Sequence, residues 1–206
     1  MDYNKLEDFS VEKFSATDIS DVSYDNQMAY FNVVRDEFTE LNQKQNSLPK
    51  DVFVRAYGQK IMDIIEMSAG GIVPAQDFLC YLYKRGLEDL MPSDLVRAHE
   101  WGILAVSNGS KLSIERLRLF FDPVYTYVLE SNKVENIIIK NKINDEQDVT
   151  DFIAQSYCIL LIDEMKIDLL TVAKKPIVEK GNFIKFSHDA TEANKKVLPK
   201  LLDLIA

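Results

Sequence analysis

Apolar residues recur every three or four positions along most of the chain, which is the spacing of helices that each bury one face. The first predicted helix starts after Asp21 or Ser23 and ends near Gln43–Asn46. Its apolar face comprises Met28, Phe31, Val34, Phe38 and Leu41. A second helix is predicted from about Pro49–Asp51 to Ala69-Gly70-Gly71. Its buried side comprises Phe53, Ala56, Ile61, Ile64 and Ile65. Residues 1–22 carry only scattered apolar positions and are predicted to form an irregular arm.

The stretch 75–109 predicts two further helices that pack against each other. Ala75, Leu79, Leu82 and Tyr83 lie on one helical face, and another face carries Leu95, Ala98, Trp101 and Ala105. Pro92-Ser93-Asp94 predicts a turn, and Ser93 or Asp94 can cap the second helix. A short connection favours antiparallel packing, and the alanine and glycine positions allow the two backbones to approach closely.

The second half is also predicted to be mostly helical. Ser110 or Ser113 can start a helix that Asp122-Pro123 breaks, and Val124–Leu129 forms a short helix after the break. Asn144-Asp145 begins a long helix with an apolar side: Val149, Phe152, Ile153, Tyr157, Leu160, Leu161 and Met165.

Three segments of this half are less clear from the pattern. Residues 134–143 suit a strand or a helix, because three consecutive β-branched isoleucines lie between helix-compatible flanks. Residues 176–186 carry a weak β-hairpin signal around Lys180-Gly181-Asn182. Thr191 can start the terminal helix, in which Pro199 marks a kink or the real start. The predicted fold class is all-α with at most this one hairpin, in a single domain spanning 23–206, with a core at 50–121 and a helical part at 123–206.

Composition places the chain among soluble, intracellular proteins. It has 206 residues, 47% of them hydrophobic, which is enough for one sizeable core. The first residues lack the pattern of a secretory signal, and no apolar run is long enough to span a bilayer. Cys80 and Cys158 are isolated, which favours two reduced, buried thiols. We therefore expect a cytoplasmic location and no membrane contact.

The net charge of −9 is unevenly distributed. Residues 1–40 carry ten acids and three bases, whereas residues 171–200 carry seven bases and three acids. An acidic chain without a concentrated basic patch argues against nucleic-acid binding. The acidic start suits either a solvated surface or a basic partner.

The sequence offers little catalytic chemistry. His99 and His188 lie far apart, and a surface position is the favoured interpretation of each, with His99 facing outward beside Glu100. No nucleophile motif or metal-ligand spacing occurs, and Cys80 falls on a predicted buried helix face, where a thiol is inert. We expect no enzyme activity, no cofactor and no metal.

The small and aromatic positions of 75–109 resemble a Sel-one-like repeat, a helix-pair unit related to the tetratricopeptide repeat. The matching residues are Ala75, Leu79, Tyr83, Gly86, Asp94, Ala98, Trp101, Ala105 and Gly109. Cys80 stands where the family usually has glycine, and the loop lacks the usual second glycine and is longer. Partial units flank this one on either side, so the resemblance covers a quarter to a third of the chain.

The resemblance implies an array of antiparallel helix pairs and a scaffold or adaptor that binds another protein. Tyr81, Arg85 and Glu100 are the candidate partner-binding residues on its surface. An alternative follows from the acidic first 40 residues: an immunity-type inhibitor that neutralises a basic toxin or nuclease. An enzyme is a third hypothesis, which would need a cleft around His99 or His188 with converging acids.

Overall fold

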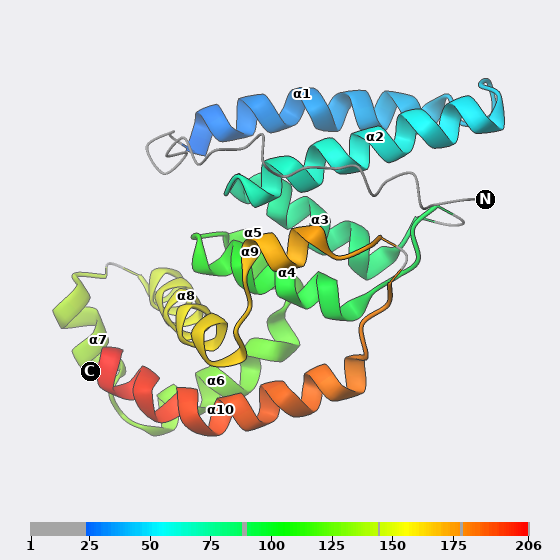
Figure 1. Ribbon diagram of the computed structural model, residues 1–206. Helices are drawn as coiled ribbons and strands as arrows, with labels where there is room; N and C mark the ends of the chain where they lie inside the picture. Colours follow the sequence, from blue (N-terminus) through cyan, green and yellow to red (C-terminus); the bar gives the residue numbers. More distant parts are fainter. Residues whose placement is uncertain (1–23, 88–89, 144, 178, 206) are drawn as a thin grey trace.

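The computed structural model describes residues 24–87, 90–143, 145–177 and 179–205, and within them the chain forms ten α-helices and no β-strand (Figure 1). The predicted arm at 1–22 and the cap at Asp21 or Ser23 lie outside these residues. The helices are α1 (Tyr24–Gln43), α2 (Lys50–Ala69), α3 (Val73–Arg85), α4 (Leu95–Ser107), α5 (Lys111–Arg116), α6 (Arg118–Glu130), α7 (Val134–Asn141), α8 (Glu146–Met165), α9 (Leu169–Lys174) and α10 (Phe183–Ile205). The prediction of a mostly helical fold is confirmed.

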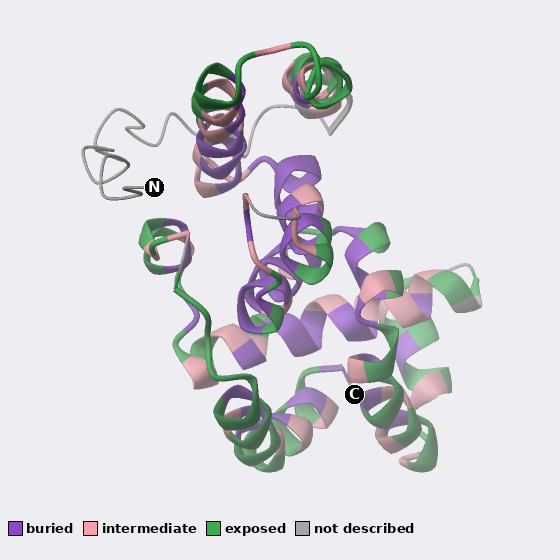
Figure 2. Cartoon of the chain, turned by 90° about the vertical axis from the view of Figure 1, so that its right-hand side faces the viewer, coloured by how far each residue is buried: buried purple, intermediate pink, exposed green. Residues whose placement is uncertain are grey.

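Helix α4 is central to the packing. Its most extensive contact is with α3, and it also contacts α5, α8, α9 and α10. Helices α1 and α2 lie side by side along one edge of the molecule, and α10 runs along the opposite edge (Figure 1). Buried residues concentrate in the central helices, whereas the outer helices expose one side (Figure 2). Buried apolar residues of both the first and the second half belong to one cluster, which includes Ile64, Trp101, Tyr157 and Val197.

Helices α3 and α4 run antiparallel, as the short connection predicts. Tyr83, near the end of α3, contacts Arg97 near the start of α4. Gln76, near the start of α3, bonds Asn108 just after the end of α4, and Cys80 faces Gly102 between these two pairs. The residue numbers of the contacting pairs therefore fall along α3 as they rise along α4. A Cβ added at Gly102 would lie 3.1 Å from the Cys80 sulfur and 2.7 Å from a methyl of Leu117. Glycine at this position therefore lets the helices approach closely.

The capping residues and glycines that the sequence offers at the ends of α3 and α4 act as such in the structure. The Asp94 carboxylate caps the helix by accepting from the amides of Val96 and Arg97, at 3.1 and 3.2 Å. Gly86 ends α3 with φ 73° and ψ 172°, a conformation that side-chain-bearing residues rarely adopt. Gly109 also has a positive φ, 92°, after α4.

The expected break at Asp122-Pro123 is wrong. The chain leaves helical geometry at Leu117 instead, and α6 then runs from Arg118 through Pro123. Because Pro123 lies in the second turn of this new helix, its missing amide removes a single hydrogen bond. Residues 134–141 are helical, which resolves the ambiguity there.

The weak hairpin signal at 176–186 is wrong too, and so is the start of the last helix at Thr191. Helix α10 begins at Phe183, where the Asn182 side chain accepts from the Lys185 amide at 3.0 Å. The described residues between α9 and α10, which we call the strap (175–177 and 179–182), form no strand. Their backbone groups bond side chains of α4 and its N-cap instead: the Pro176 carbonyl accepts from Arg97, and the Gly181 amide donates to Asp94 at 3.2 Å.

No helix in the described part of the chain combines the length and the apolar character needed to cross a bilayer.

Candidate functional site

One hollow lies where α1, α2 and the end of α3 meet, and we call it the α3 groove. It encloses about 410 Å³. Its described lining residues are Phe38, Asn42, Gln45, Tyr57, Phe78, Tyr81, Leu82, Arg85, Gly86, Leu87 and Leu90. The aromatic rings pack on one another, with ring centroids of Phe38 4.7 Å from Tyr57 and 5.6 Å from Phe78. The groove therefore has an aromatic wall built from three helices.

Two of the three predicted partner-binding residues lie at this groove. Tyr81 is 37% exposed, on the side of α3 away from the buried Leu79 and Tyr83, as the helical spacing predicts. Arg85, one turn later, donates from Nη1 to the Tyr81 hydroxyl at 2.6 Å. The Tyr81 ring lies 6.3 Å from that of Phe78, which connects the exposed residue to the aromatic wall.

The third residue, Glu100, does not belong to this surface. It is buried, and both of its carboxylate oxygens lie 2.5 Å from the ammonium of Lys175 on the strap. The helical spacing places Glu100 on the outer side of α4, but the strap crosses that side and covers it. Its role as an exposed contact is therefore corrected to an internal ion pair.

The outward position expected for His99 is also wrong. Its ring lies among those of Phe120, Phe183 and Phe186, with centroids 5.3 to 5.9 Å away. These residues line a second hollow of about 150 Å³ between α6 and α10. His188, in contrast, has an exposed side chain, 3.9 Å from Asp189. The described lining of the hollow beside His99 contains no acid.

Acid should weaken the fold through His99. Burial lowers the pKa of His99, against a hydrogen bond between Nδ1 and the Leu95 carbonyl. The unfolded chain then takes up a proton as the pH falls through about 6.5, while folded His99 stays neutral to lower pH. The contribution of neutral His99 to the free energy of unfolding is therefore present above about pH 6.5 and is lost as the pH falls below it.

We expect His99→Gln to flatten the fall in the urea-derived free energy of unfolding between about pH 7.5 and 5.5. His188→Gln, which changes an exposed histidine, should keep the slope of the parent chain. Equal slopes for the parent and His99→Gln would contradict the assignment.

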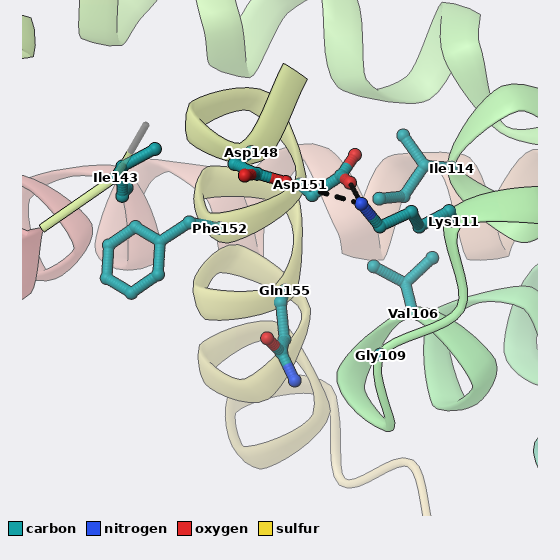
Figure 3. Close-up of a pocket in the computed structure, with 9 residues that line it drawn as sticks. All are labelled: Val106, Gly109, Lys111, Ile114, Ile143, Asp148, Asp151, Phe152 and Gln155. Atoms are coloured by element: carbon teal, nitrogen blue, oxygen red, sulfur yellow. Dashed lines mark hydrogen bonds and ion pairs between the residues drawn. The ribbon is translucent and has the colours of Figure 1, made fainter. Parts of the chain in front are cut away.

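A third hollow, of about 260 Å³, lies between α8 and the α4–α5 turn (Figure 3). Figure 3 shows the Lys111 side chain reaching toward Asp151, and the ammonium lies 2.8 Å from Asp151 and 3.3 Å from Asp148. Lys111 thus forms ion pairs with two of the acids of α8 and links α5 to that helix.

The buried polar residues near α3 serve packing. The Asp77 carboxylate accepts from the hydroxyls of Ser110, at 2.5 Å, and Ser113, and burial raises its pKa. Burial also raises the pKa of the Cys80 thiol to about 11, so it is protonated near neutral pH. Cys80 and Cys158 are free and buried, as predicted. The described side chains form no group of three or more acids, histidines and cysteines that could bind a metal.

Neither a protein-family model, nor a curated protein, nor a solved structure matches this chain.

Sequence reasoning identified Tyr81 and Arg85 but missed the rest of the α3 groove. Phe38, Asn42 and Gln45 come from α1 or the turn after it, and Tyr57 comes from α2. In the sequence, Phe38 and Tyr57 look like ordinary core residues of their helices. No local pattern shows that these segments close around the end of α3, because that closure depends on how three helices pack.

Proposed function

We propose that this chain is a non-enzymatic protein–protein interaction module, a cytoplasmic scaffold or adaptor that binds a segment of another protein in the α3 groove. The observation that carries this proposal is the exposed Tyr81–Arg85 pair at the edge of an aromatic-walled hollow. Tyrosine and arginine are enriched among residues that dominate binding energy at protein interfaces. A ring already packed on Phe78 and bonded to Arg85 loses little conformational freedom on binding.

The Sel-one-like resemblance supports the same proposal. Helices α3 and α4 form an antiparallel pair, and the signature residues that face it are buried: Ala75, Leu79, Tyr83, Ala98, Trp101 and Ala105. Gly86 and Gly109 have positive φ, and Asp94 caps α4. Because these internal residues hold the pair together, the outer side of α3 is not needed for the packing of the pair and can bind a partner.

The inhibitor alternative rests on the charge of the first residues. Residues 1–23 and 88–89 lie outside the described ranges and carry eight acids and two lysines. The described residues therefore sum to −3 out of a total of −9. Since they carry only three of the nine net negative charges, they favour a basic partner less than the whole sequence does.

Affinity capture from the native cell tests the proposal. We expect the parent chain to retain a partner protein, and Tyr81→Ala with Arg85→Ala to retain at least about tenfold less of it, because truncating an anchor costs about 2 kcal/mol. The control is Tyr30→Ala with Arg55→Ala, an exposed pair of the same residue types outside the groove. Capture that the groove substitutions leave unchanged, or the absence of any partner, would overturn the proposal.

A further inference from the structure

The described residues that line the α3 groove carry charge of one sign. Among its described lining residues the charged one is Arg85, and the remaining polar side chains are the amides of Asn42 and Gln45 and the hydroxyls of Tyr57 and Tyr81. The rest of the lining is apolar or glycine. A chain with a net charge of −9 thus presents, among the described residues of this groove, a cation without an acidic neighbour.

Arg85 keeps most of its hydrogen-bonding capacity. A guanidinium has five N–H donors, and the bond that Arg85 makes goes to the neutral hydroxyl of Tyr81. Arg85 takes part in none of the ion pairs formed among the described side chains, in contrast to Lys60, Lys111 and Lys196. The side chain is exposed and held in place by Tyr81, so its free edge can receive a carboxylate without losing an internal partner.

The surroundings add positive charge beside the same ring. The Arg116 guanidinium lies 5.7 Å from the Tyr81 ring centroid, and that of Arg85 lies 6.0 Å from it. Lys84 donates to the Arg116 carbonyl at 3.1 Å, which keeps its ammonium nearby. Asp77 lies close to Arg116, at 4.0 Å, but it is buried under α5 and is not at the surface. A negatively charged segment is therefore attracted to the edge where Tyr81 lies.

The groove also offers groups that suit a polypeptide. Asn42 and Gln45 each carry an amide that can donate to a backbone carbonyl and accept from a backbone N–H. The aromatic wall and the side chains of Leu87 and Leu90 can surround an apolar side chain. Such a division, apolar contact for one residue and fixed polar groups around it, is typical of sites that recognise a short segment.

We infer that the α3 groove binds an acidic segment of a partner protein, with an apolar side chain against the aromatic wall and an adjacent Asp or Glu on Arg85. This inference rests on the proposed function and specifies the chemistry of the partner.

Selection of peptides provides the test. Random dodecapeptides displayed on phage are panned against the immobilised full chain, and the enriched peptides are synthesised with a fluorophore for anisotropy titrations. We expect the enriched peptides to share an aromatic or aliphatic residue next to Asp or Glu. Arg85→Gln should lower their affinity about tenfold to about 100-fold, as expected for a lost hydrogen-bonded charge. Arg55→Gln, an exposed arginine of α2 outside the groove, should change it less than about twofold.

Charge reversal adds a readout that a misfolded variant cannot produce. Arg85→Glu should abolish binding of the acidic peptides, and replacing the critical Glu of a peptide by Lys should restore binding to this variant. Affinity of the original pair should also fall as salt is raised, because the pairing is near the surface.

Three results would overturn the inference: no enriched peptide, enriched peptides without a carboxylate, or binding that is indifferent to Arg85→Gln. If capture from cells still depends on Tyr81 and Arg85 in those cases, the proposed function stands and only the acidic chemistry of the partner is wrong. If capture does not depend on them, the proposed function and the acidic chemistry are both wrong.

Discussion

Replacing Asp94 by alanine is expected to lower the free energy of unfolding by about 3–5 kcal/mol, a large part of the roughly 5–15 kcal/mol that stabilises an ordinary domain. The side chains of Asp94 and Arg97 are each 2% exposed, and Arg97 Nε lies 3.3 Å from Asp94 Oδ2. Without the carboxylate, the guanidinium of Arg97 would remain buried without a counter-charge. Its other partners, the Tyr83 hydroxyl and the Pro176 carbonyl, are neutral.

The charge accounts for most of this effect. Asp94 also caps α4, a contribution of about 1 kcal/mol, and accepts from the Gly181 amide of the strap. Asp94→Asn keeps one oxygen that can accept from the Val96 and Arg97 amides, but it loses the charge and the acceptor of the Gly181 amide, so it should fall between the parent and Asp94→Ala. Arg97→Met should cost less than Asp94→Ala, because the remaining carboxylate still accepts from three backbone amides.

Urea denaturation followed by circular dichroism measures all three variants. If Asp94→Ala does not fold, Asp94→Asn and Arg97→Met still report the order of the effects. A loss of about 1 kcal/mol or less for Asp94→Ala would mean that only the helix cap is lost, and it would contradict the buried ion pair.

Replacing Trp101 by alanine should lower the free energy of unfolding by about 3–5 kcal/mol through the cavity that it leaves. Trp101 is 1% exposed and is the largest fully buried side chain among the described residues. It shares one apolar cluster with Leu79 and Tyr83 of α3 and with Tyr157 of α8. Since α4 contacts both of those helices, a cavity there weakens the packing of both halves.

Trp101→Phe should cost less than Trp101→Ala, since the smaller ring fills part of the space. Leu119→Ala is the matched control: Leu119 is 87% exposed, and its loss should change the stability by no more than about 0.5 kcal/mol. A value below about 1.5 kcal/mol for Trp101→Ala in the same urea titrations would show that the indole is not a central part of the core.

The two stability predictions and the groove experiments separate two kinds of residue. Asp94 and Trp101 are buried in the α3–α4 pair, whereas Tyr81 and Arg85 lie on its outer side. Substitutions of the second kind should leave the urea midpoint nearly unchanged while reducing capture. Binding and folding can therefore be measured independently in this protein.

Most helices of the described chain follow from local signals in the sequence. The caps at Asp94, Ser110 and Asp145 each accept from a backbone amide at the start of a helix, and Gly86 ends α3. Apolar spacing placed Leu79 and Tyr83 inside and Tyr81 outside. These properties depend on residues within one or two turns, so the sequence by itself determines them. It missed α9 and the true start of α10, although Asp168 and Asn182 are caps of the same kind.

Only the tertiary structure decided what covers each outer face. Glu100 and His99 lie on a side of α4 that a single helix would expose, and the strap and α10 cover that side from about 75 to 90 positions later in the chain. The α3 groove likewise requires Phe38, Tyr57 and Tyr81 from three helices to meet. Burial of this kind depends on contacts between distant segments, and these are set by the packing of the whole core and not by the spacing of residues within one helix.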